Sequence, residues 1–497
     1  MKKVIALRIK SGKTLYDFNS ILKGLNLFLC LLIIYLYSEN GDNEYVNLST
    51  IILGIVMGLQ NIGMLYYEKK KTNPFLIILV FVMTIFYLFR VATLINNPQS
   101  YMFIRDSITP EDLNFSLVFI LLSNASIFLG LYTSNLSTVK PIDNKVHLFS
   151  FRKLYNLLAI LCFLVILIFI SNIGFTGGAI GAFLQHLFLH QEAVLIFTFC
   201  FLLYYKDSIS RKAFFLTSII ILIFIIFVTI AGSRSGILTV FYLFLFSVLV
   251  VKRRFLIRRF FLLIGILVIP ISLLLFMFST FNRNLELKEK DPFVILSLIK
   301  SEDIINQEGL AFFTGKTFER IGFLDFNTTM ITKSDLYENV ISTKYYFYSI
   351  VDNLLTPGFD IFNTAKATHV IGRLANGEPF PTRLEAALGD YYQSDMMGIY
   401  GEYYVLFYGY PALVVFFVIS FFIQRLYNII YKNDEFARIL FRAIILSVFF
   451  TWLNSFGTDW ILIEVTTMVA TFFFLKPFYL SPIKRRIQQI EKQIIHE

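Results

Sequence analysis

Long apolar runs separated by short polar connections make up most of the chain. A helix needs ~20 apolar residues to cross the hydrocarbon core of a bilayer, and runs of about this length recur along the sequence. They lie at 21–37, 48–67, 75–95, 115–132, 154–173, 192–205, 260–278, 398–423, 439–456 and 460–475. A run at 213–251 is about twice as long and predicts two helices. The pattern predicts an all-α polytopic membrane protein with about 12 transmembrane helices.

One short polar break interrupts the 213–251 run, at Ala231-Gly232-Ser233-Arg234-Ser235-Gly236. Its small residues allow a tight turn and leave backbone amides free beside a permanently charged guanidinium. The break therefore predicts the turn of a helical hairpin. Arg234 in this turn either meets an anionic headgroup or a diphosphate, or snorkels to lipid phosphate.

Lysines and arginines gather at alternate ends of the apolar runs. The segments before residue 21 and after residue 475 are basic, and so are both flanks of the hairpin, whereas the short connections on the other side hold only Arg105 and Arg234. Because basic flanks mark the cytoplasmic side, both termini are expected inside and Arg234 at the outer face. We expect helices 1–9 in residues 1–279, a large extracytoplasmic loop at 280–397, helices 10–12 at 398–475 and a basic cytoplasmic tail at 476–497.

The loop at 280–397 is the longest stretch without a predicted crossing. A loop of this length in a compact protein usually carries function, and helical patterns occur in it at 292–300 and 345–355. We expect a helical cap with an aromatic groove, because a glycan needs both stacking faces and hydrogen bonds. Candidate substrate-binding residues in the cap are Tyr345, Tyr391, Arg320, Lys366, Arg373 and Arg383, and Arg283 follows the preceding run closely.

Composition excludes a soluble enzyme, because hydrophobic residues make up 57% of the chain and charged residues 16%. The formal charge of +10 lies at the ends of apolar runs and not on one polar surface, which disfavours a nucleic-acid partner. Cys30, Cys162 and Cys200 all fall inside apolar runs, so neither a disulfide framework nor a cysteine metal site is indicated.

Several polar residues stand inside or beside the runs. Arg90, just over one turn from the outer end of its run, either snorkels or lines an outward cavity, and snorkelling is favoured. His186 and His190 have the spacing of zinc ligands, but without a third ligand nearby they are interpreted as interfacial. Asp459 is interpreted as a solvated turn residue. The acidic residues show no metal-ligand cluster, so we expect no metal and no cofactor.

Three motifs resemble the bacterial O-antigen and capsule repeat-unit polymerases of the Wzy type, which belong to a wider group with the O-antigen ligases. The first is Gly232-Ser233-Arg234-Ser235-Gly236 at the hairpin turn. The second is Leu354-Leu355-Thr356-Pro357-Gly358-Phe359 in the large loop, with Lys366 after it. The third is Gly398-Ile399-Tyr400-Gly401-Glu402-Tyr403-Tyr404-Val405-Leu406-Phe407-Tyr408-Gly409-Tyr410-Pro411, which leads into the next run.

The resemblance implies glycosyl transfer at the outer face of the bacterial cytoplasmic membrane. A growing glycan on undecaprenyl diphosphate would be the donor, a lipid-linked repeat unit the acceptor and a chain-length regulator a further partner. Negative charge develops on the lipid diphosphate as it departs, and the planar guanidinium of arginine suits a diphosphate. Arg234 and Arg283 are the candidates for stabilising this charge. A base would help the acceptor hydroxyl, and His369 and Glu402 are the candidates. Glu402 is equally a candidate for structural pairing.

Two other functions remain open from the sequence. An O-antigen ligase shares this chemistry but transfers the finished glycan to lipid A core. A polysaccharide flippase or transporter belongs to another class, but it typically has short outer loops and places cations through the middle of the membrane. The long loop and the peripheral charges disfavour the flippase.

Overall fold

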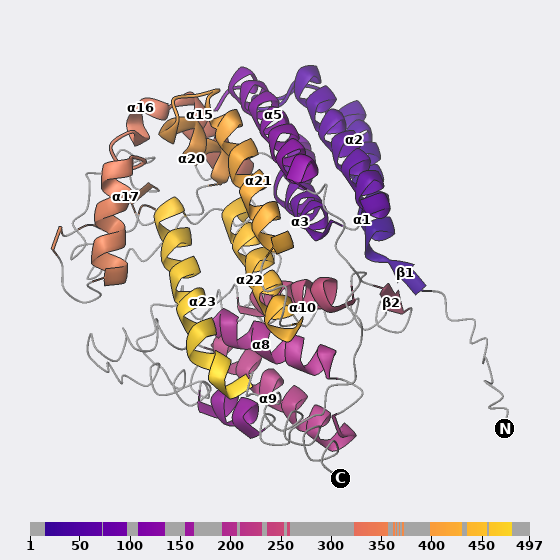
Figure 1. The fold of residues 1–497 in the computed structure, drawn as a ribbon. Helices are drawn as coiled ribbons and strands as arrows, with labels where there is room; N and C mark the ends of the chain where they lie inside the picture. The colour runs from indigo at the N-terminus through magenta and orange to yellow at the C-terminus, as the bar shows by residue number, and fades with distance from the viewer. Residues whose placement is uncertain are drawn as a thin grey trace, which may run out of the picture.

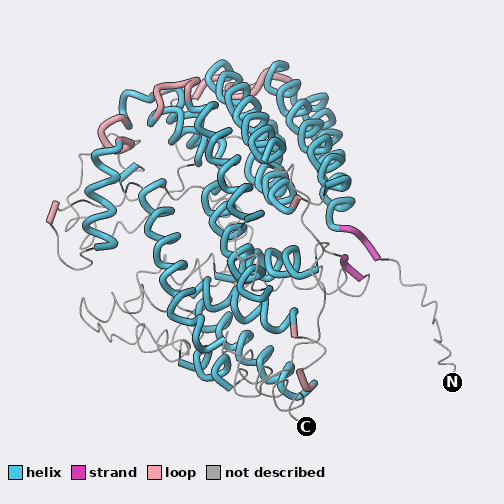
Figure 2. The backbone as a smooth tube through the Cα atoms, viewed as in Figure 1, coloured by secondary structure: helices cyan, strands magenta, loops and turns pink. Residues whose placement is uncertain are grey.

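The protein is almost entirely helical in the computed structural model (Figures 1 and 2). The structure describes residues 15–71, 73–96, 108–134, 155–163, 191–205, 209–230, 236–252, 256–258, 323–355, 361–362, 364, 367, 370–371, 398–429, 435–454 and 457–479. Within them, six helices are long and apolar enough to cross a membrane: Phe18–Asn40, Leu48–Tyr67, Pro74–Asn96, Pro110–Ser134, Ala412–Ile429 and Phe436–Asn454. The described residues therefore agree with a polytopic helical membrane protein, while the full number of crossings stays a prediction.

The elements before residue 260 are two short strands and a series of helices. They are β1 (Leu15–Asp17), α1 (Phe18–Asn40), α2 (Leu48–Lys71), α3 (Pro74–Val82), the π-helix η1 (Met83–Leu88), α4 (Phe89–Asn96), α5 (Pro110–Ser134), α8 (Gln191–Tyr204), α9 (Arg211–Ile230), α10 (Gly236–Lys252) and β2 (Leu256–Arg258). Helices α9 and α10 contact each other and flank residues 231–235. The two helices of the predicted hairpin are thus present, and the turn lies outside the described residues.

The later elements are all helical. They are α15 (Phe323–Thr332), α16 (Ser334–Tyr337), α17 (Thr343–Ile350), the π-helix η2 (Val351–Leu355), α20 (Ile399–Leu406), α21 (Ala412–Ile429), α22 (Glu435–Asn454) and α23 (Thr458–Tyr479). The helix predicted at 345–355 is confirmed as α17 with η2, whereas the pattern at 292–300 lies outside the described residues.

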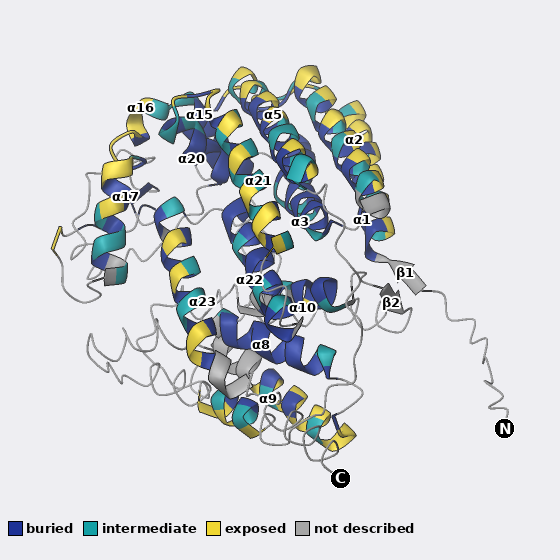
Figure 3. Cartoon of the chain, in the orientation of Figure 1, coloured by how far each residue is buried: buried dark blue, intermediate teal, exposed yellow. Residues whose placement is uncertain are grey.

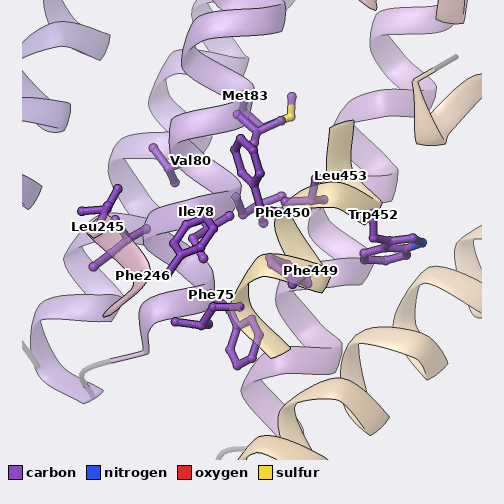
Figure 4. Close-up of a cluster of buried hydrophobic side chains, with 14 of the residues drawn as sticks. Phe75, Ile78, Val80, Met83, Leu245, Phe246, Phe449, Phe450, Trp452 and Leu453 are labelled. Carbon is purple, nitrogen blue, oxygen red and sulfur yellow. The ribbon is translucent and has the colours of Figure 1, made fainter. Parts of the chain in front are cut away.

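The third predicted crossing, formed by α3, η1 and α4, is one of the two most buried candidate crossings among the described residues. In its apolar window 78% of the residues are buried, against 28% in α1, and Figure 3 shows α1 and α2 with exposed outer faces. A helix that is apolar all round belongs in the interior of a bundle. Phe75 and Ile78 of α3 pack there with Phe246 of α10 and Phe449 of α22 (Figure 4).

Helices α5 and α21 approach each other closely at Gly130. A Cβ atom at this position would collide with the carbonyl oxygen of Phe417 and meet Ser420. Because helices in a bilayer gain little from the hydrophobic effect, small residues that permit such contact are a main source of association. Gly130 therefore fixes α21, and the helix α20 before it, against the first half of the bundle.

The predicted crossing at 398–423 is wrong in its start. The structure divides it into α20, a turn and α21, and only α21 has the length and composition of a crossing. Tyr408 and Gly409 have φ values of 54° and 92°, which end α20 in a left-handed turn. The amide of Gly409 donates to the carbonyl of Tyr404 at 2.7 Å, and Pro411 follows. Hydropathy alone does not register this break, because the turn residues are apolar.

The two strands pair antiparallel, with Leu15 opposite Arg258 and Asp17 opposite Leu256. The pairing holds the chain before α1 and the chain after α10 at one end of the bundle. That arrangement agrees with the charge pattern, which assigns both segments to the same side.

Candidate functional site

Three of the predicted site residues fall in the described part of the chain: Arg90, Tyr345 and Glu402. The others lie outside the described residues, namely Arg234, Arg283, Arg320, Lys366, His369, Arg373, Arg383 and Tyr391. The site is therefore described from its carboxylates and the helices that hold them.

The glycines of the third motif are explained by close packing of α15 on α20. A Cβ atom at Gly398 would collide with the side chain of Asn327, and one at Gly401 would meet Met330 and the backbone of Asn327. Gly398 also has a φ of 66°, which favours glycine. The side chain of Asn327 accepts a hydrogen bond from the amide of Gly401 at 2.5 Å. Both glycines thus let α15 and α20 meet at backbone distance.

Glu402 lies at the junction of α17, α20 and α23 and is fully buried. Its Oε1 accepts hydrogen bonds from the Tyr346 hydroxyl and from the Thr458 amide, both at 2.7 Å. Thr458 is the first residue of α23 and follows Gly457, whose φ is 93°. The first amides of a helix have no partner within it and form the positive end of its dipole. Glu402 therefore caps α23 from another helix, and this positive end offsets the cost of burying its charge.

Asp459 is fully buried in the first turn of α23, so the prediction that it is solvated is wrong. Its Oδ2 accepts hydrogen bonds from the Ser349 hydroxyl at 2.6 Å and from the Ala367 amide at 3.2 Å. The error arises from tertiary contacts: Ser349 of α17 and Ala367 bond to Asp459 in a turn that, taken by itself, is polar.

Tyr346 is bonded to Glu402 and lies within electrostatic reach of Asp459. Burial, together with the negative charges of Glu402 and Asp459, raises the pKa of its hydroxyl well above the usual range. The hydroxyl therefore stays protonated and remains a donor to Glu402 at any physiological pH. Tyr345, predicted to line a glycan groove, is also buried, and it packs beside Val370 and Ile371. Its role in a glycan groove stays a prediction.

A third buried carboxylate, Asp352 of η2, organises the chain that follows it. Its Oδ1 accepts from the amides of Ile361 and Phe362 at 3.0 and 3.1 Å, and its Oδ2 from the amide of Thr364 at 2.8 Å. Together with the bond from Ala367 to Asp459, these contacts fix four backbone positions between 361 and 367. In sequence, Lys366 lies within this segment and His369 lies two residues after it.

Arg90 is fully buried in α4 and paired with Asp325 of α15, so the snorkelling interpretation is wrong. Nε donates to Oδ1 at 3.1 Å and Nη2 to Oδ2 at 2.5 Å, which is the bidentate geometry that suits arginine. The pair joins a crossing helix to a segment predicted to belong to the outer loop. Arg90 thus holds α15 in place, and its role in substrate binding stays a prediction.

The sequence analysis also missed the hydrogen-bonded polar side chains that surround α20. Asn327 donates to the Tyr87 hydroxyl at 3.0 Å, and the Tyr400 hydroxyl donates to Asn124 at 2.5 Å. Tyr87 stands in η1, where the Phe89 amide bonds the Thr84 carbonyl five residues earlier. Such π-segments often occur at functional sites. The signal in the sequence was that Asp325 and Asn327 stand among apolar residues. In the structure these neighbours are buried as well.

Within the described residues, no three histidine, cysteine or acidic side chains are arranged to hold a metal ion. His186 and His190 lie outside that part of the chain. No family model, curated protein or solved structure matches this chain. The motif resemblance is therefore carried by the residues alone.

Proposed function

We propose that the protein polymerises lipid-linked oligosaccharide repeat units at the outer face of the cytoplasmic membrane, in O-antigen or capsule synthesis. It would transfer a growing glycan from undecaprenyl diphosphate to a lipid-linked repeat unit. One observation carries the proposal: Glu402 of the third motif and Asp459 meet at the start of α23, where Asp459 and Asp352 anchor the segment that leads to Lys366 and His369.

The reaction divides the work between positioning and reacting groups. An acceptor hydroxyl attacks the anomeric carbon of the donor, its proton passes to a base, and the bond to the lipid diphosphate breaks with the electron pair on the leaving oxygen. We assign the base to His369 and a positioning role to Glu402, because Glu402 is buried and its Oε1 already accepts two hydrogen bonds. Lys366, Arg234 and Arg283 would stabilise the departing diphosphate.

Positioning of this kind matters because reacting groups must lie within about 3–3.5 Å in aligned geometry, and a displacement of ~1 Å costs on the order of 100-fold in rate. Three buried carboxylates and the start of a helix are a rigid platform for that purpose. The platform is built from α17, η2, α20 and α23.

The test is lipid-linked glycan analysis in a strain that lacks the protein. We expect single repeat units to accumulate on the lipid, with long chains restored by the wild-type gene. Accumulation of long chains on the lipid would identify a ligase instead. Repeat units trapped at the inner face would identify a flippase.

A further inference from the structure

Helix α17 has two faces of different character. Tyr345, Tyr346 and Ser349 are buried against the site described above. On the other side Phe347 is 59% exposed, and Tyr348 stacks on Phe362 with ring centroids 4.1 Å apart and an interplanar angle of 17°. Ile361 and Phe362 are 60% and 42% exposed. An exposed apolar group of this kind on an ordered element indicates an interaction surface.

The position of α17 indicates what covers this surface. Ser349 bonds Asp459 in the first turn of α23, so α17 lies against the start of that helix. Figure 1 shows α17 beside the upper part of α23 and below the upper ends of α1, α2 and α5. Helices α1, α2 and α5 are long and apolar enough to cross a membrane. Helix α17 therefore lies alongside the helical bundle and not beyond its upper end.

Three backbone amides beside this face are satisfied in the way that a bilayer requires. Hydrocarbon offers no water to pair with free amides, so non-helical chain at membrane depth must find internal partners. Asp352 takes up the amides of Ile361, Phe362 and Thr364. A water-exposed turn has no need of a buried carboxylate for this purpose.

We infer that α17, η2 and residues 361–362 form an anchor embedded in the edge of the lipid bilayer, with acyl chains covering Phe347, Ile361 and Phe362. Lys344, exposed at the start of α17, has its Nζ 5.8 Å from the Tyr348 ring centroid, and a lysine at the edge of an apolar face can keep its charge near lipid phosphate while its stem packs on apolar groups. Aromatic side chains are enriched at this depth of a membrane. The segment predicted as an aqueous cap thus includes a lipid-facing element, whatever the reaction.

The test places a bimane probe on single cysteines of the full-length protein in phosphatidylethanolamine–phosphatidylglycerol vesicles. Cys162 is exposed while Cys30 and Cys200 are buried, so Cys162→Ser provides the background. The probe positions are Phe347→Cys and Ile361→Cys. Phe422→Cys on α21, where Phe422 is 62% exposed, is the lipid control, and Glu44→Cys in the exposed connection between α1 and α2 is the water control.

At both probe positions we expect blue-shifted emission, quenching by acyl-brominated lipid close to that at Phe422→Cys, and iodide quenching several-fold below that at Glu44→Cys. Strong iodide quenching without bromolipid quenching would overturn the inference and favour a water-facing platform on which a glycan stacks. Protection from both quenchers would also overturn it, because another protein surface would then cover the face. Two probe positions keep the test valid if one variant is not monodisperse on gel filtration.

Discussion

Glu402 accepts hydrogen bonds from two donors, the buried Tyr346 hydroxyl and the partly buried Thr458 amide. Glu402→Gln keeps an accepting oxygen and removes only the charge that the start of α23 stabilises, so it should lower the free energy of unfolding by about 1 kcal/mol. Glu402→Ala removes the acceptor of both donors and should cost about 1–3 kcal/mol for the buried Tyr346 hydroxyl alone. Thermal unfolding in detergent measures the difference. Equal losses from the two variants would contradict the capping role.

Arg234 is the residue whose predicted role depends most on its guanidinium. Lysine keeps the charge but loses the fork, and loss of charge-assisted hydrogen bonds to a developing anion costs about 2–4 kcal/mol. Arg234→Lys should therefore reduce polymerisation by roughly two orders of magnitude while membrane abundance stays near normal. Polymer length and amount, resolved on gels of extracted glycan, measure the effect. Wild-type polymer from both Arg234→Lys and Arg234→Ala would refute the role.

For single residues, the sequence pattern singled out Glu402 but led to wrong predictions of burial elsewhere, for a physical reason. Glu402 was identified because it stands in a glycine-aromatic motif, and the glycines are now explained by the approach of α15. Asp459 and Arg90 were misjudged because their partners, Ala367 and Asp325, are about 92 and 235 positions away in sequence. Local hydropathy carries no information about such contacts.

Helices α4 and α15 are joined by the buried pair of Arg90 and Asp325. Removing one partner leaves an uncompensated buried charge, so Arg90→Met and Asp325→Leu should each cost about 3–5 kcal/mol. The double variant should be less destabilised than the sum of the single variants, because it removes both charges. A double-mutant cycle on thermal unfolding measures this coupling. Additive losses would show that the pair does not hold α15.

Element boundaries were predictable where the hydropathy pattern changes sharply. They were not predictable where backbone conformation alone ends a helix. The ends of α9 and α10 fall at the predicted break because small residues and an arginine interrupt a uniform apolar run. The turn after α20 was missed because Tyr408 and Tyr410 look like membrane residues while the left-handed φ of Tyr408 and Gly409 is invisible to hydropathy. The π-segment η1 was missed because its residues are as apolar as their neighbours.

For the whole molecule, the orientation in the membrane rests on charge flanks and can be tested on exposed positions. In the Cys162→Ser background, Glu44→Cys and Leu336→Cys should react with an impermeant thiol reagent from outside the cell, whereas Lys212→Cys should react only after permeabilisation. All three positions are exposed. Asn327, a natural choice in the loop by sequence, is unsuitable because it is fully buried. Reaction of Lys212→Cys in intact cells would show that the hairpin has the opposite orientation and that Arg234 does not lie at the outer face.

The polytopic helical architecture was predictable from the sequence because apolar runs of membrane length leave few alternatives. How the later segments enter the bundle was not, because α15 and α17 carry mixed residues typical of a soluble cap. Their burial depends on specific partners on α4, α20 and α23. The carboxylate platform is therefore a product of tertiary packing.

The most direct test of the account is the initial rate at which purified protein in vesicles extends lipid-linked oligosaccharide repeat units. Wild-type protein should form lipid-linked polymer, and His369→Asn should slow it by at least about 100-fold, as expected for loss of a general base. Glu402→Gln should slow it by about tenfold, corresponding to ~1.4 kcal/mol of lost positioning. Glu192→Gln, which alters a carboxylate bound by the Tyr242 and Ser447 hydroxyls in another part of the bundle, should leave the rate unchanged. Absence of polymer with wild-type protein, or a wild-type rate with His369→Asn, would contradict the account.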